Sequence, residues 1–249
     1  METIVPKTSD ALTALLRADF TTQWRNRRSS ILVLLVPVII LISWKGLVEK
    51  VGGAFILSSC ITIGLIAIGL MGYSNAIARD RDKGIFQRLR ATPVPSWAIM
   101  VSRLVVQLAM IMLLTAIVFI AGHYYDNITI SMSGYVLGFV AAILGGALYL
   151  GLGQLIVGLL KNPETVNSTT RLVYFVFIMV GMFGEFGIFG ERLKNMVHWS
   201  PYGTVKNILS ASMEPSKWSS TTSMALLITI LYAVVFSFLG IKKFKWNSK

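Results

Sequence analysis

The sequence is poor in charged residues. Asp, Glu, Lys and Arg make up 14% of its 249 residues, whereas a soluble globular domain carries about 25%. Hydrophobic residues make up 55% and gather in blocks that are too long for the core helices of a soluble protein. A disordered chain would be poor in apolar residues and rich in charge. The composition therefore excludes disorder, disfavours a soluble enzyme and predicts an integral membrane protein.

Residues suited to catalysis or to metal binding are also scarce. Cys60 is the only cysteine, which excludes a disulfide framework and a multi-cysteine metal site. The two histidines, His123 and His198, lie in different predicted loops without a carboxylate pattern beside them. The phosphate-binding motif Gly-x-x-x-x-Gly-Lys-[Ser/Thr] does not occur. We therefore expect no catalytic residue, no metal and no cofactor in this chain, and no ATP binding by the P-loop mechanism.

Six apolar blocks are long enough to cross a membrane. A transmembrane helix needs roughly 20 apolar residues to cover about 30 Å of hydrocarbon. Since only helices and closed barrels satisfy the backbone in lipid, continuous runs of this length predict helices. We expect an all-α membrane protein whose single domain, 1–249, holds six transmembrane helices at 30–48, 52–78, 104–122, 134–160, 172–190 and 223–241.

Basic residues are distributed unevenly between the two sides of this topology. Seventeen Lys and Arg residues fall on the side of both termini and of the loop 79–103, and six fall on the other side. The positive-inside rule then places both termini in the cytoplasm. The basic excess is expected to contact anionic membrane lipids, so nucleic acid is not an expected partner.

Two segments outside the spans have amphipathic character. Apolar residues recur at helical spacing in 8–28, close to several arginines, which predicts an interfacial helix on the cytoplasmic side. The segment 191–222 is too polar to span a membrane but contains Trp199 and Trp218. We expect it to form short re-entrant helices at the outer interface.

The most specific motif lies in the loop 79–97, where residues 79–95 read RDRDKGIFQRLRATPVP. Alternating charges are followed by a short predicted helix with Ile85, Phe86 and Leu89 on one face. Pro93 and Pro95 prevent the helix from continuing. A rigid projection with an apolar tip can dock into a groove of a partner. The alternative is a solvated loop with ordinary positive-inside charges.

The pattern acidic-x-acidic-x-Gly-x-x-x-x-Leu-x-x-Thr-Pro-Val after the second span resembles the type-2 ABC exporter permeases, the membrane subunits of bacterial drug and antibiotic exporters. In that family this segment is the coupling helix. Asp80, Asp82 and Gln87 stand where the family usually has Glu, and they keep its hydrogen-bonding capacity. The resemblance covers nearly the whole chain. It implies that the motif residues contact an ATPase, namely Asp80, Asp82, Gly84, Ile85, Phe86, Arg88 and Leu89.

The resemblance also implies partners and a location. A separate ATP-binding subunit would bind ATP and Mg²⁺, and a second permease copy would complete the pathway, with a homodimer favoured over a heterodimer. The expected location is the bacterial plasma membrane, with several passes and both termini in the cytoplasm.

Two spans carry candidate residues for a substrate pathway. The fifth span has a flexible aromatic and Met-rich face, which suits bulky apolar substrates. Alternatively, this face could contact lipid or pack in the core. In the family that the chain resembles, however, the paired fifth spans face a central cavity. The second span has a mildly polar track, and a carboxylate near the outer end of the fifth span lies at a costly depth. These candidates are Ser59, Thr62, Tyr73, Phe175, Met179, Met182, Glu185 and Phe186.

The fourth span has two features of interest for packing. Gly134, Gly138, Ala142 and Gly146 form a stripe of small residues, for which we favour close packing between spans of one chain over a contact between subunits. Gln154 is expected to be an interhelical hydrogen-bond partner.

Taken as a whole, the chain is expected to be the membrane subunit of an ATP-driven exporter of a hydrophobic or amphipathic small molecule, such as a drug, an antibiotic or a lipid-like compound. Such an activity would serve multidrug resistance. The alternatives are a permease for lipid-linked polysaccharide, and a membrane transporter or scaffold that is not coupled to ATP.

Overall fold

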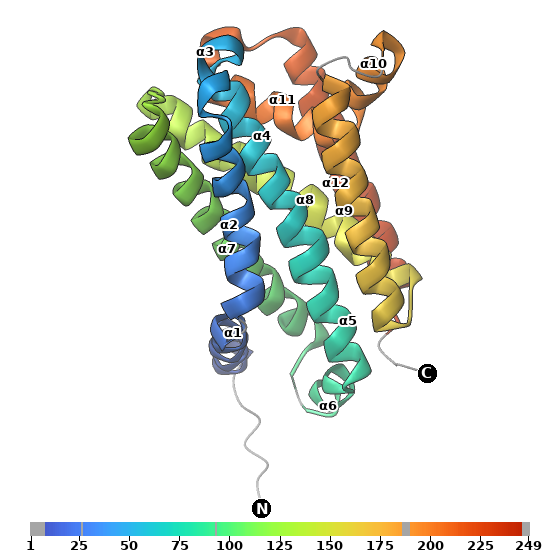
Figure 1. Cartoon of the computed structure of the whole chain (residues 1–249). Helices are drawn as coiled ribbons and strands as arrows, with labels where there is room; N and C mark the ends of the chain where they lie inside the picture. The colour runs from blue at the N-terminus through green and yellow to red at the C-terminus, as the bar shows by residue number, and fades with distance from the viewer. Residues whose placement is uncertain (1–7, 26, 93, 186–189, 246–249) are drawn as a thin grey trace, which may run out of the picture.

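The computed structural model describes residues 8–25, 27–92, 94–185 and 190–245, and every regular element within them is a helix. Helices α1 (Thr8–Arg25) and α6 (Ile85–Arg90) lie at one end of a bundle of long helices, where α12 also ends (Figure 1). We call this the α6 end. Helices α10 (Glu191–Trp199) and α11 (Pro201–Met213) lie at the opposite, α10 end. The prediction of an all-α membrane fold is confirmed.

Each predicted span has a helical counterpart, and the first is bent. Within the described residues, five long helical segments are apolar enough to cross a membrane. Helix α2 (Arg27–Ser43) meets the short elements η1 (Lys45–Leu47) and α3 (Val48–Val51) at an angle of 51°, and this bent pair counts as a sixth span if taken as one. The five are α4–η2–α5 (Gly53–Ile66, Ala67–Ser74 and Asn75–Asp82), α7 (Ser96–Asp126), α8 (Met132–Leu159), α9 (Pro163–Glu185) and α12 (Ser220–Lys243).

The bounds of the third and fifth spans differ from the prediction because hydropathy marks the apolar part of a helix and not its ends. Helix α7 begins at Ser96 rather than at 104, directly after Pro95, whose extended backbone caps it. Its polar first turns are stabilised by partners on other helices. Helix α9 begins at Pro163 rather than at 172, and proline at a first helical position is favourable because its missing N–H is not needed there.

The second span lies at the centre of the bundle. In its most apolar stretch 89% of the residues are buried, against 17% for both α9 and α12. Small residues bring α8 close to this span: a Cβ on Gly69 would lie 2.5 Å from the backbone oxygen of Tyr149. The stripe on α8 also packs within the chain, since a side chain on Gly138 would overlap Phe119 of α7. The predicted intramolecular packing of this stripe is confirmed.

Between α4 and α5 the second span passes through a π-helix, η2. The wider turn leaves carbonyl groups for side chains, and Ser74 Oγ donates to the backbone oxygen of Gly69 at 2.9 Å. Within the same turn, the Tyr73 hydroxyl donates to Gln154 Oε1 of α8 at 2.8 Å. This confirms Gln154 as an interhelical hydrogen-bond partner.

The short helices predicted for 191–222 are present as α10, α11 and the turn η3 (Pro215–Lys217). Helix α11 enters the bundle and packs against α4, α8 and α12. Its Lys206 is buried, and the amine lies 3.2 Å from the centre of the Phe55 ring. Ser200 caps α11 by accepting a hydrogen bond from the Gly203 amide at 3.3 Å.

Candidate functional site

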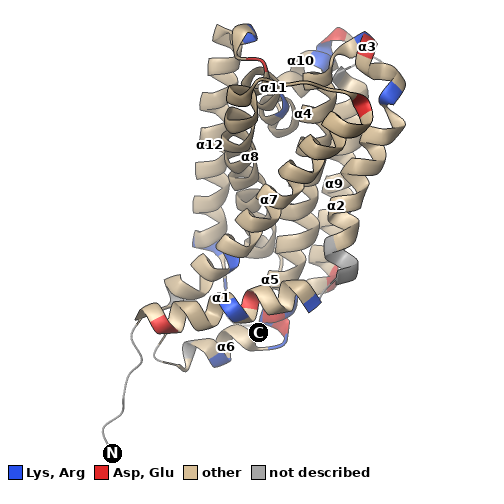
Figure 2. Ribbon diagram, turned by 90° about the vertical axis from the view of Figure 1, so that its left-hand side faces the viewer, with Lys and Arg blue, Asp and Glu red and all other residues tan. Residues whose placement is uncertain are grey.

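The motif of residues 79–95 begins inside α5 and turns at Gly84. This glycine has a φ of +67°, in the left-handed region that side chains with a Cβ disfavour. Arg88 Nη2 donates to the backbone oxygen of Lys83 at 2.9 Å across the turn. Helix α6 therefore does not continue the direction of α5. It lies across the same end of the bundle as α1 (Figure 2).

Arg81 joins α5 to the end of α8. Its guanidinium is buried and donates to the backbone oxygens of Val157, Leu160 and Lys161 at 2.8, 2.6 and 2.8 Å. The last carbonyls of a helix lack intrahelical partners and carry partial negative charge, so a cation is favourable there. The sequence pattern identified Arg81 only as one of several alternating charges and did not predict this role. Consecutive residues of a helix point about 100° apart, so the alternation of charges already indicated that neighbouring charged residues would meet different partners.

Asp80 faces a different set of partners from Arg81. Its Oδ2 lies 2.6 Å from Arg103 Nη1 of α7, and Arg103 Nε lies 3.2 Å from Asp19 Oδ1 of α1. Ser102 Oγ also donates to Asp19 Oδ2 at 2.5 Å. Burial raises the pKa of Asp19, although Arg103 and Ser102 act in the opposite direction. One guanidinium thus connects α1, α5 and α7.

The expectation that Phe86 forms an exposed apolar tip is wrong. Its side chain is 0% exposed, and its ring meets the ring of Phe244 edge to face, with 6.0 Å between the centres. The physical reason is that α6 lies flat on the bundle, so that its apolar face is buried in its own chain. Ile85 and Leu89 are partly buried. The exposed side chains of the motif are mostly polar and include Asp82, Lys83, Gln87 and Arg88.

Phe244 follows α12 and is a contact that sequence analysis did not single out. Its ring lies against Phe86 and also lies 5.8 Å from the Arg81 guanidinium carbon. The Arg103 guanidinium carbon lies 6.0 Å from the ring of Phe86 on α6. Arg81, Phe86, Arg103 and Phe244 therefore form one group, which we call the α6 anchor.

The predicted polar track on the second span does not line an open surface. Ser59 and Thr62 are buried, and they donate to the backbone oxygens of Phe55 and Ser58 in their own helix at 2.8 and 2.7 Å. The expectation fails because the second span is central and every side of it is covered. Tyr73 is buried as well, but it borders a cavity at the α6 end.

The aromatic and Met-rich face of α9 is only partly open. Phe175 is 59% exposed, whereas Met179 and Met182 are partly buried and Met182 packs against the core. Helix α9 ends at Glu185, whose side chain lies outside the described residues, as does Phe186. Phe175 is exposed whereas Ser59 and Thr62 are buried, so these candidates do not line one open surface.

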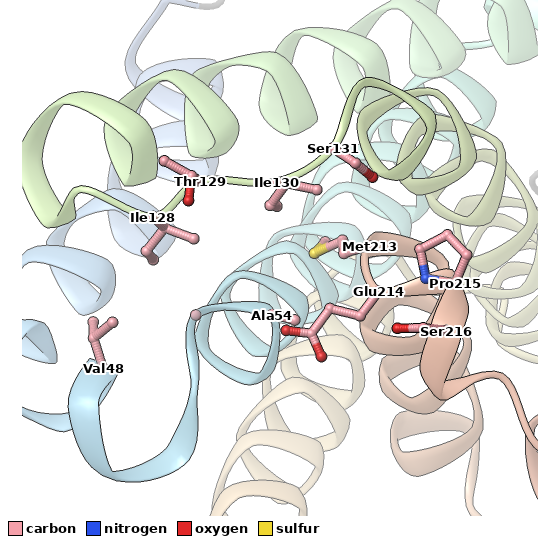
Figure 3. A pocket seen from close by; sticks show the side chains of 11 residues that line it. Val48, Ala54, Ile128, Thr129, Ile130, Ser131, Met213, Glu214, Pro215 and Ser216 are labelled. Carbon is pink, nitrogen blue, oxygen red and sulfur yellow. The ribbon is translucent and has the colours of Figure 1, made fainter.

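A second cavity, of about 390 Å³, lies at the α10 end between the start of α4, the segment 128–131 and the end of α11 (Figure 3). Glu214 extends into this region and also pairs with Lys217. None of the residues predicted for a site borders this cavity. Among the residues that the structure describes, no three His, Cys, Asp or Glu side chains gather in a way that could hold a metal ion.

The long apolar helices, together with a charged turn anchored at one end of them, define a multi-pass α-helical membrane protein. A family model described as ABC-2 type transporter matches residues 10–213, and the chain belongs to this family. It is therefore the membrane-spanning permease part of an ABC transporter, and the family implies an ATP-binding partner. No curated protein matches the chain.

Proposed function

We propose that the chain is the permease subunit of an exporter that moves a hydrophobic or amphipathic small molecule out of a bacterial cell. A separate ATPase subunit docks at the α6 end, which faces the cytoplasm, and a second copy of the chain completes the pathway. The observation that carries this proposal is the α6 anchor, because it joins the exposed face of the motif to α8 and to the end of α12.

Coupling requires that a displacement of α6 reach the spans. Arg81 transmits it to α8, and the contact of Asp80 with Arg103 transmits it to α7 and α1. An ATPase that closes on α6 would favour one of two arrangements of these helices through its differential contacts with them. The polar face with Gln87 and Arg88 is the docking surface in this proposal, and the buried Phe86 acts within the chain.

The docking surface is tested by placing a bulky side chain on it. Gln87 is exposed, so Gln87→Trp should leave the fold and membrane insertion intact but obstruct the ATPase. We expect at least a tenfold loss of ATPase affinity, which corresponds to about 1.4 kcal/mol. Co-purification of the ATPase and cargo-stimulated ATP hydrolysis are the measurements. The matched control is Lys194→Trp at the α10 end. Equal retention of the ATPase by both variants would show that α6 is not the docking surface.

The pathway is proposed to follow the exposed face of α9 between two copies of the chain. Phe175 and Val176 are exposed on this helix, and both are apolar. Phe175→Ala should change the rate or the preference of export without loss of the assembled complex, since truncation widens the path without affecting the core. Export assays with cargoes of different size measure this effect. If export were unchanged, the exposed face of α9 would be interpreted as a lipid contact and not as part of the pathway.

A further inference from the structure

A cavity of about 240 Å³ lies at the α6 end, between α1, the η2–α5 segment and α7. Polar side chains from all three elements line it, among them Asp19, Arg79, Asp80, Lys83, Arg103 and Gln107. Among the described residues, the lining of this cavity includes none of α6, so Gln87 and Arg88 of the proposed docking surface lie outside it, whereas the neighbouring Lys83 borders it.

Gln107 is the most informative lining residue. Its side chain is 6% exposed, but its amide atoms are not among the fully enclosed polar atoms that lack a partner, so the amide reaches the open space of the cavity. Within the described residues this amide makes no hydrogen bond to protein, and a polar group at a cavity wall can bind water or a ligand. The neighbouring Tyr73 hydroxyl already donates to Gln154. The amide of Gln107 is therefore available to donate a hydrogen bond to a molecule that occupies the cavity.

The charges of the lining favour an anion. Asp19 and Asp80 both pair with Arg103 and are neutralised in part by it. Arg79 and Lys83 are exposed at the cavity, and neither has an ion pair within the described residues. An anionic group that entered here would meet two unpaired cations and the amide donor of Gln107, a combination that suits phosphate oxygens.

The position of the cavity indicates the source of the phosphate. One wall is α1, which exposes the aromatic side chains of Phe20 and Trp24, at 44% and 73%. Aromatic and basic residues on an amphipathic helix are typical of the headgroup region of a membrane. The opening therefore lies where phospholipid headgroups are present at high local concentration.

We propose that this cavity binds the phosphate group of an anionic phospholipid from the leaflet at the α6 end. Gln107 donates to a phosphate oxygen, and Arg79 and Lys83 pair with its charge. The bound lipid fills the space between α1 and the α5–α7 pair, next to the contact of Asp80 with Arg103. The proposal does not depend on ATPase docking or on the identity of the cargo.

The test uses the purified full chain, delipidated in a neutral detergent and titrated with phosphatidylglycerol, phosphatidylcholine or inorganic phosphate. Native mass spectrometry measures lipid binding, and the lipid-dependent shift in unfolding temperature gives a second readout. We expect preferential binding of phosphatidylglycerol. Gln107→Leu and Arg79→Gln should each weaken it about tenfold, as expected for the loss of a charge-assisted hydrogen bond. The matched controls, Gln87→Leu and Lys161→Gln, should bind it like the unchanged chain.

A second variant distinguishes a loss of lipid binding from a folding defect, which Gln107→Leu alone could also cause. Lys83→Gln changes an exposed side chain at the cavity, so its unfolding temperature without lipid should stay near that of the parent while the lipid-dependent shift becomes smaller. Equal binding of phosphatidylglycerol by Lys83→Gln and the parent would overturn the proposal. Complete competition by inorganic phosphate at the lipid's own concentration would overturn the assignment to a lipid.

Discussion

The two ends of the bundle use charged and polar residues in different ways. At the α6 end, polar contacts join parts of the chain that are far apart in sequence, as from Arg81 to Val157 and from Ser102 to Asp19. At the α10 end, the ion pairs among the described residues join residues three positions apart, Glu191 with Lys194 and Glu214 with Lys217, and the contacts between helices are instead uncharged hydrogen bonds such as that from the Tyr149 hydroxyl to the backbone oxygen of Pro201. Pairs of the first kind connect helices, whereas pairs of the second kind lie within one helical turn.

The α10 end also depends on close backbone packing. A side chain on Gly203 would overlap the backbone oxygens of Val197 and His198, and one on Gly134 would overlap the backbone of Met213. Such contacts fix one arrangement, because the interior tolerates no added volume. Side-chain pairs such as that of Asp80 with Arg103 can exchange partners. If the ATPase docks at the α6 end, as proposed, the motion that it drives would enter through contacts that can exchange partners, while the backbone packing at the α10 end would be retained.

The largest effect is expected for Arg81→Ala. This change removes the donor from the buried backbone oxygen of Val157 and from the oxygens of Leu160 and Lys161 just after α8, which costs about 3 kcal/mol of unfolding free energy, as found for buried charge-assisted bonds. Thermal unfolding of the purified chain measures the loss. Arg81→Lys should recover only part of it, because an ammonium cannot reproduce the geometry of the guanidinium.

Arg79→Ala is the control for Arg81→Ala, since the side chain of Arg79 is exposed two positions away. It should change the unfolding free energy by less than about 0.5 kcal/mol in lipid-free detergent. If Arg79→Ala and Arg81→Ala were equally destabilising, charged residues that join helices at the α6 end would contribute no more to stability than exposed ones.

A smaller effect is expected for Phe244→Ala. The change removes the edge-to-face contact with Phe86 and exposes part of α6, at a cost of about 1–2 kcal/mol. We expect weaker stimulation of ATP hydrolysis by cargo, with the ATPase still bound, because the docking surface itself is unchanged. Phe244→Leu should restore part of the stimulation, and Lys245→Ala should have no effect. A double-mutant cycle with Phe86→Leu that gave no coupling energy would contradict the α6 anchor.

Much of this fold could be predicted because its determinants are local. Runs of apolar residues mark the spans, and the glycine at 84 and the prolines after α6 mark the turns. Gln154 could be predicted as a hydrogen-bond partner because an amide within an apolar span needs one. None of these inferences requires knowledge of which helices are neighbours.

The burial of particular side chains could not be predicted in the same way. Phe86 is covered by Phe244, which lies far along the chain, so its exposure depends on where α12 ends. The burial of Ser59 and Thr62 could not be predicted either. Lipid and protein core are equally apolar, so hydropathy does not distinguish a central helix from a peripheral one. The partners of Asp80 and Arg81 likewise depend on the positions of α7 and α8 around α5.

The smallest effect is expected for the pair of Glu191 with Lys194 on α10. The two charged atoms lie 3.3 Å apart, but the side chains are 79% and 47% exposed, so solvent screens their attraction. Lys194→Ala should lower the unfolding free energy by at most about 0.5 kcal/mol, and this small loss should vanish in 1 M salt. Thermal unfolding at low and high salt, alongside Arg81→Ala, measures both quantities. Because Arg81 is buried and bonded to backbone carbonyls, its effect should persist at high salt. A loss for Lys194→Ala as large and as salt-resistant as that for Arg81→Ala would mean that the α10 end also relies on its charged pairs.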